Sequence, residues 1–158
     1  MGAAQRNRVM TEGTVESIEI KGTPAEVFAV AADLAAYTDW ATGVKEIEIL
    51  ETDKAGRAHR ARFVIDGMVK EITYTLVYSY DEPASMRWEA EPGPDLKELE
   101  GSYVFNEVAD GRTEVVYGLK VEPSFTIPGF LRRQAEKQLV GTALRGLRKR
   151  VESLGPKL

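Results

Sequence analysis

The sequence predicts an α+β fold in which a curved antiparallel sheet of about six to seven strands wraps around a long C-terminal helix. Three observations support this prediction. Apolar residues alternate with period two in short runs along most of the chain, turn-forming residues separate these runs, and a final segment of helical period contains no proline. Because the connections are too short to hold crossover helices, neighbouring strands are expected to be antiparallel.

The first predicted elements are a strand and two short helices. Residues 14–20 alternate as expected for a strand. Residues 23–26 (Thr-Pro-Ala-Glu) then form the pattern of a capping box, with a proline at the first helical position. This pattern predicts that a helix begins there, and a second short helix or turn is expected over residues 34–40.

After Gly43 the sequence changes to strand-like runs. Turn signals lie between them at residues 53–56, 66–67, 81–83, 92–95 and 110–111. The clearest strand covers residues 72–80, and its predicted inner face consists of Ile72, Tyr74, Leu76, Tyr78 and Tyr80. In the last hairpin Gly101 lies in mid-strand, a position where glycine often marks a bend or a bulge.

The final segment, from Pro128 to about Leu154, predicts one helix roughly 40 Å long at about 1.5 Å per residue. A turn of about 100° per residue sorts its side chains into faces. The large apolar stripe contains Val140, Leu144, Leu147, Val151 and Leu154. Beside it lies a face of mostly small residues, namely Ala135, Leu139, Thr142, Ala143 and Gly146.

Composition favours one folded domain. The chain has 158 residues, 43% hydrophobic and 29% charged, and we expect a flexible tail over residues 1–12 followed by a single domain over residues 13–155. There is no cysteine, which excludes disulfides and thiolate chemistry. No apolar run reaches the roughly 18–20 residues of a membrane span, and the first residues lack the apolar stretch of a signal peptide. A cytoplasmic location fits these features.

Charge is unevenly distributed along the chain. The net charge of −4 argues against a dedicated nucleic-acid-binding protein. The segment from Pro128 to Leu154 nevertheless carries seven basic and two acidic residues, which makes it +5 and the remainder −9. Basic residues on a helix most often form a solvated face, and cations near its C-terminus suit the helix dipole.

Several motifs together resemble those of the helix-grip superfamily, which includes START lipid-transfer domains, birch-pollen-type allergens and bacterial polyketide cyclase/dehydrase-like proteins. They lie at residues 23–28, 33–40, 44–56, 101–103 and 110–115 and in the closing helix, so the resemblance covers residues 14–154. It is greatest to the small bacterial cyclase/dehydrase-like branch, although Thr38 stands where that family typically has proline. The resemblance implies a helix-grip fold with a ligand cavity, but it does not imply a particular reaction.

A cavity is also expected on physical grounds, because a single helix cannot fill the concave side of a long curved sheet, and such gaps become ligand sites. The predicted ligand-binding residues come from the inner strand faces, the tryptophans and the small face of the helix. They are Trp40, Phe63, Ile65, Tyr74, Leu76, Tyr78, Trp88, Tyr103, Tyr117, Leu139, Thr142, Ala143 and Gly146. The tyrosine hydroxyls among them are candidate polar anchors. In the alternative interpretation, favoured for at least half of these tyrosines, they are core aromatics with their tips at the sheet edge.

The sequence offers no strong catalytic or metal-binding motif. His59 is the only histidine and follows a turn between two arginines, so a surface position is expected and a Ser-His-Asp triad is not. With one histidine and no cysteine, a metal site would need several carboxylates, and the glutamate pairs fit ordinary strand alternation. We therefore predict no catalytic residue, no metal ligand and no cofactor.

Three functional hypotheses follow. The first is a protein that binds a small hydrophobic ligand of lipid-like, polyketide-like or isoprenoid-like type. The second is a cyclase or dehydratase that acts on a polyketide with tyrosines and a carboxylate as acid and base. The third is implied by coenzyme-Q-binding and ribosome-associating toxin-like relatives, in which the basic helix meets RNA, a membrane surface or a partner. No nucleic-acid partner is expected, and the sequence does not fix the oligomeric state.

Overall fold

The computed structural model describes residues 13–66 and 70–155. Within them, seven antiparallel strands form one sheet in the order β1-β7-β6-β5-β4-β3-β2. The strands are β1 (Thr14–Lys21), β2 (Val44–Thr52), β3 (Ala58–Asp66), β4 (Glu71–Asp81), β5 (Ser85–Ala90), β6 (Leu96–Ala109) and β7 (Arg112–Pro123). The helices are α2 (Pro24–Ala32), the 3₁₀ turn η1 (Leu34–Ala36), α3 (Tyr37–Trp40) and α4 (Gly129–Ser153).

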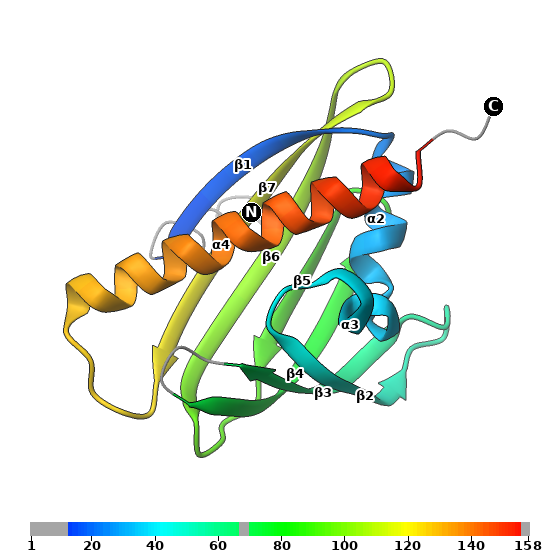
Figure 1. Cartoon of the computed structure of the whole chain (residues 1–158). Coiled ribbons are helices and arrows are strands. Elements are labelled where there is room, and N and C mark those ends of the chain that lie inside the picture. Colours follow the sequence, from blue (N-terminus) through cyan, green and yellow to red (C-terminus); the bar gives the residue numbers. More distant parts are fainter. Residues whose placement is uncertain (1–12, 67–69, 156–158) are drawn as a thin grey trace, which may run out of the picture.

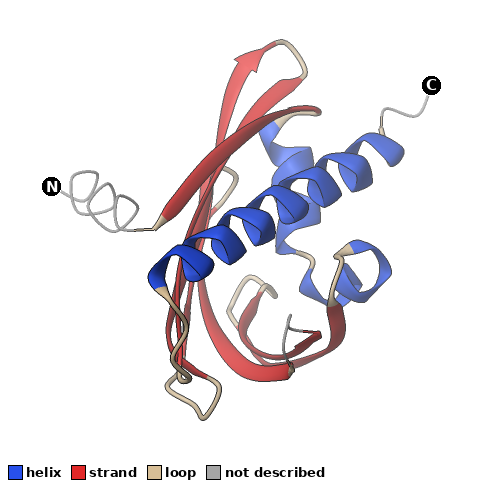
Figure 2. Cartoon of the chain, turned by 60° about the vertical axis from the view of Figure 1, so that its left-hand side comes forward, coloured by secondary structure: helices blue, strands red, loops and turns tan. Residues whose placement is uncertain are grey.

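The sheet curves around α4, which crosses its concave side (Figures 1 and 2). Strands β2 to β7 form a simple meander, and β1 extends the sheet beyond it by pairing with β7. The two short helices lie between β1 and β2 and cover one end of the concave side (Figure 1). This arrangement confirms the predicted α+β helix-grip fold.

The start of α2 is the predicted capping box. The Thr23 side-chain oxygen accepts a hydrogen bond from the Glu26 backbone N–H at 3.2 Å, and the Glu26 carboxylate accepts one from the Thr23 backbone N–H at 2.8 Å. These bonds satisfy two backbone donors that a helix start otherwise leaves free. The helix then buries Phe28, whose ring meets Tyr80 and Phe105 edge to face.

The large apolar stripe of helix α4 is buried, except for one residue. Val140, Leu144, Leu147 and Val151 are buried. Leu154, the fifth predicted member, is 46% exposed. Its prediction as a packed residue was wrong because the helix ends at Ser153, so Leu154 caps the helix instead of continuing its inner face.

The predicted turns differ in outcome. Gly111 connects β6 and β7 with φ +70°, a left-handed conformation that glycine adopts without strain. The second residue of the predicted Asp66-Gly67 turn lies outside the described residues. No bulge occurs at Gly101, because its pairing with Trp88 and with Leu119 is regular. The glycine instead permits close packing, since a Cβ there would lie 2.3 Å from the Trp88 indole ring.

No helix in the described part of the chain combines the length and the apolar character that a membrane crossing requires.

A buried glutamate joins α4 to the edge of the sheet. Glu136 is only 6% exposed. One of its carboxylate oxygens accepts a hydrogen bond from the Thr14 hydroxyl at 3.1 Å, and the other accepts one from the Val121 backbone N–H at 2.8 Å. The side chain thereby links the helix to β1 and β7, which are adjacent strands.

Replacing Glu136 with alanine should reduce the free energy of unfolding by about 1–3 kcal/mol, because a partly buried backbone N–H and a partly buried hydroxyl lose their acceptor. Urea denaturation measures this loss. The matched control is Gln138→Ala, an exposed position on the same helix, for which a change within about 0.5 kcal/mol is expected. Equal effects of the two substitutions would show that Glu136 does not anchor the helix.

Candidate functional site

A cavity of about 250 Å³ lies between the sheet and α4. Its wall is built from the inner faces of β3 to β7, from α3 and the loop that follows it, and from the small face of α4. Four lining residues are exposed and therefore mark the mouth: Thr42, Gly43, Asp66 and Leu139. The mouth thus lies between the loop after α3, the end of β3 and the helix.

All thirteen residues predicted from the sequence line this cavity. The inner strand faces contribute Phe63, Ile65, Tyr74, Leu76, Tyr78, Trp88, Tyr103 and Tyr117, and the helices contribute Trp40, Leu139, Thr142, Ala143 and Gly146. The structure places these residues around one space, while ligand binding by them remains a prediction.

Sequence reasoning missed other lining residues for two reasons. Ile72, Leu99 and Val121 also line the cavity; they share their strand faces with predicted residues, Ile72 with Tyr74, Leu99 with Tyr103 and Val121 with Tyr117. Tyr37 and residues 41–43 belong to a short helix and a loop, which have no periodicity long enough to assign a face. Only their tertiary position brings them to the wall.

The small face of α4 borders the cavity instead of packing closely on the sheet. Thr142, Ala143 and Gly146 line the space together with Trp40 of α3. A Cβ added at Gly146 would lie 3.6 Å from the Trp40 ring, an ordinary van der Waals distance. The small side chains therefore leave volume that larger ones would occupy.

The cavity wall contains a continuous set of aromatic rings. Phe63 stacks on Tyr74 with ring centroids 5.6 Å apart. Trp88 contacts Tyr103 at 5.2 Å and Tyr117 at 5.7 Å, and the two tyrosine rings are themselves 4.7 Å apart. Such ring pairs contribute stability beyond the area that they bury and hold one another in place.

The tyrosine hydroxyls fall into two groups. Those of Tyr37 and Tyr80 donate hydrogen bonds to the backbone oxygens of Ala31 and Ala58. The other four hydroxyls have no hydrogen-bond partner among the described residues; they belong to Tyr74, Tyr78, Tyr103 and Tyr117, which line the cavity as Tyr37 does, whereas Tyr80 does not. Burial raises the pKa of all four well above its usual value, and for three of them nearby tyrosines raise it further.

One other polar atom stands out. In the described part of the chain, Trp40 Nε1 is the fully enclosed side-chain donor without a hydrogen-bond partner. Its ring meets Tyr37 edge to face, with centroids 5.1 Å apart. The four tyrosine hydroxyls are not enclosed in this way, so they border open space in the cavity.

Charge is scarce around the cavity. Asp66 is the one charged residue among the described lining residues, and it is exposed at the mouth. Arg62 of β3 and Glu71 of β4 do not line the cavity; Arg62 pairs with Glu48 at 3.0 Å and Glu71 with Lys45 at 2.6 Å. No cation lines the space in the described structure.

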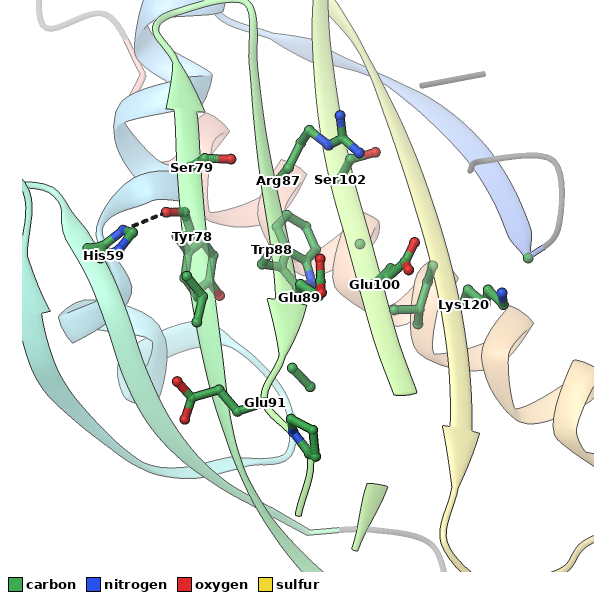
Figure 3. A pocket seen from close by; sticks show the side chains of 16 residues that line it. His59, Tyr78, Ser79, Arg87, Trp88, Glu89, Glu91, Glu100, Ser102 and Lys120 are labelled. Carbon is green, nitrogen blue, oxygen red and sulfur yellow. Dashed lines mark hydrogen bonds between the residues drawn. The ribbon is translucent and has the colours of Figure 1, made fainter. Parts of the chain in front are cut away.

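A second, larger hollow of about 600 Å³ lies on the opposite face of the sheet (Figure 3). Most of its side chains come from the outer faces of β3 to β7, and α4 lies behind these strands in the view. Tyr78, Trp88 and Leu119 border both this hollow and the inner cavity. His59 is exposed there, and its Nδ1 lies 3.0 Å from the Tyr78 backbone oxygen. Glu91 forms an ion pair with Arg60 at 2.8 Å. This charged, open surface is less suited to an apolar molecule than the aromatic cavity.

Metal ligands do not gather at either site, since residues 13–66 and 70–155 contain no group of three or more histidine, aspartate or glutamate side chains that could hold an ion.

Comparisons with known proteins agree with the observed architecture. Residues 12–153 match the family described as polyketide cyclase/dehydrase and lipid transport. No curated protein matches the sequence.

Three solved structures illustrate the likeness. A START superfamily protein from Mycobacterium smegmatis is 18% identical, with a TM-score of 0.84 over 90% of this chain and 98% of that one. A protein from Thermus thermophilus is 26% identical, with a TM-score of 0.76 over 90% and 99% of the two chains. An aromatase/cyclase from a Streptomyces species is 17% identical, with a TM-score of 0.76 over 88% and 92%.

If the small face of α4 borders unfilled volume, Ala143→Leu should leave the melting temperature unchanged or raise it, whereas overpacking a filled contact costs about 1–3 kcal/mol. The same substitution should weaken the binding of a flat aromatic probe such as 2-naphthol at least about tenfold, equivalent to about 1.4 kcal/mol. Differential scanning fluorimetry and calorimetric titration measure the two effects.

Gln138→Leu, on the exposed side of the same helix, is the matched control and should leave probe affinity unchanged. A large drop in melting temperature for Ala143→Leu, with unaltered probe affinity, would mean that this face packs directly on the sheet.

Proposed function

The chain belongs to the polyketide cyclase/dehydrase and lipid transport family, and from this premise we propose that it binds a small hydrophobic ligand in the cavity between the sheet and α4. The observation that carries the proposal is the unfilled aromatic space itself. Protein interiors are normally packed as densely as organic crystals. A volume of 250 Å³ left open in such an interior therefore calls for an explanation.

The apolar wall of the space favours an occupant. Water that enters through the mouth would lie against aromatic rings, and an apolar molecule that displaces it removes apolar surface from water. Because the mouth is lined by exposed residues of a loop and a helix, a ligand has a route of entry.

The dimensions favour a compact ligand. Pockets for drug-sized molecules measure about 300–1,000 Å³, so this cavity is slightly below that range. Its wall consists largely of flat rings, which suit a flat or cyclic molecule. A long-chain lipid would fit only if part of it extended through the mouth or if the cavity expanded.

The enzymatic alternative, a cyclase or dehydratase, finds weaker support. General acid–base catalysis works best with groups whose pKa lies near the operating pH. The lining tyrosines have their pKa raised away from neutrality by burial, and the one histidine lies on the opposite face of the sheet. Asp66 is the candidate base nearest the cavity, and it is exposed at the mouth, not held against the ligand space.

Native mass spectrometry of freshly purified protein tests the proposal. We expect a discrete population of the chain that carries one small molecule, which is released when the same sample is denatured with acid. In addition, because both tryptophans line the cavity, a long-chain fatty acid or a flat polycyclic phenol should change the intrinsic fluorescence saturably. Protein without any added mass, combined with no fluorescence change across chemically different apolar ligands, would contradict the binding function.

A further inference from the structure

Four tyrosines line the cavity with hydroxyls that have no hydrogen-bond partner among the described residues. These hydroxyls indicate the polar chemistry of the ligand, which the apolar wall does not. They belong to Tyr74 and Tyr78 of β4, Tyr103 of β6 and Tyr117 of β7. The two strands of the last hairpin place Tyr103 and Tyr117 directly opposite each other. The inference drawn from them rests on the proposed function, because it concerns the chemistry of the ligand in the same cavity.

The positions of the four rings are fixed by their neighbours. Tyr74 is stacked on Phe63, while Tyr78, Tyr103 and Tyr117 all contact Trp88 at centroid distances between 5.2 and 5.7 Å. All four tyrosines belong to strands of the sheet, whereas Thr142 lines the cavity from the helix. The sheet thus presents fixed tyrosine rings to a largely apolar space, and their hydroxyls have no hydrogen-bond partner among the described residues.

Buried hydroxyls in proteins normally have hydrogen-bond partners, because an unsatisfied group loses its interactions with water. Tyr37 and Tyr80 follow this rule, since their hydroxyls donate to backbone oxygens. The four lining tyrosines depart from it in the described structure. Because these hydroxyls are not fully enclosed, water or a ligand that lies in the cavity can supply their partners.

The hydroxyls are neutral under physiological conditions. Burial raises the pKa of each, so the proton is retained as the pH rises through neutrality, and every hydroxyl remains able both to donate and to accept. A ligand oxygen of any common type, whether carbonyl, ether or hydroxyl, can therefore pair with them. A pure hydrocarbon would leave them unsatisfied.

Charge sets a second restriction. A carboxylate placed in the cavity would lose its hydration, and no lining cation among the described residues compensates for that loss. The charged group at the mouth is Asp66, which repels an anion. The lost hydration and the repulsion by Asp66 both disfavour the binding of an acid whose carboxylate would lie inside the cavity.

We propose that this cavity selects uncharged cyclic molecules that carry oxygen atoms, in preference both to hydrocarbons and to carboxylates of the same ring size. The four hydroxyls form the hydrogen-bonding side of the site, and the surrounding rings provide the apolar contacts. Ligand specificity then depends on side chains that are also part of the aromatic wall.

A matched ligand series tests the proposal with the full chain at pH 7. Calorimetric titration compares naphthalene, 2-naphthol, 2-methoxynaphthalene and 2-naphthoate, which share one ring system and differ in a single substituent. We expect the phenol and the ether to bind at least about tenfold more tightly than the hydrocarbon and the carboxylate, a difference of about 1.4 kcal/mol.

Tyrosine-to-phenylalanine variants connect this preference to the hydroxyls. Tyr74→Phe, Tyr78→Phe, Tyr103→Phe and Tyr117→Phe, made separately, keep the ring and remove the oxygen. At least one should reduce the preference for 2-naphthol over naphthalene severalfold while naphthalene affinity is maintained. Tyr80→Phe is the matched control, because that hydroxyl is bonded to the Ala58 backbone and Tyr80 does not line the cavity. Circular dichroism confirms that each variant folds.

The outcomes separate the two proposals. If naphthalene or 2-naphthoate binds as tightly as 2-naphthol, the selection by hydroxyls is refuted while the binding function stands. If 2-naphthol is preferred but no phenylalanine variant alters the preference, the hydroxyls are not its source and the proposal is likewise refuted. If none of the four compounds binds, both the selection and the proposed function fail.

Discussion

The structure depends on how α4 is held over one part of the concave sheet and not over the rest. The helix packs on β1, β7 and α2 through its large apolar stripe, and Glu136 bonds it to Thr14 and to the Val121 backbone. Its small face borders the space in front of β3 to β7, which α3 and the loop after it close at one end. The large apolar side chains of α4 pack on β1, β7 and α2, so that its small side chains border the cavity. Aromatic rings line this cavity but do not fill it.

The aromatic wall is held together by contacts between side chains of neighbouring strands. The inner faces of β4, β5, β6 and β7 bring tyrosines and Trp88 close together, and Gly101 leaves room for the Trp88 indole to lie against its neighbouring strand. The rings are thus fixed by packing, while four of their hydroxyls are left to the cavity. An apolar wall with unpaired neutral hydroxyls is a more selective surface than an aliphatic core of the same volume.

The sequence predicted the fold and the wall of the cavity because both follow from periodicity. Alternation along 72–80, 99–105 and 115–121, together with the helical period of α4, places side chains on faces without any tertiary information. The parts that failed depend on tertiary position. The Glu136 link, the role of Gly101 as a packing site and the exposure of Leu154 follow from where α4 lies and ends. Tyr37 and the loop at 41–43 contribute to the wall without any periodic pattern.

The central claim is that a ligand occupies the space between the aromatic wall and the small face of α4. Nuclear Overhauser effects between bound 2-methoxynaphthalene and assigned methyl groups of the protein test it most directly. The account predicts contacts to the Ala143 and Thr142 methyl groups of α4 and to Ile65 of β3, all of which line the cavity. Contacts confined to Val77, which lines the hollow on the opposite face, would contradict it.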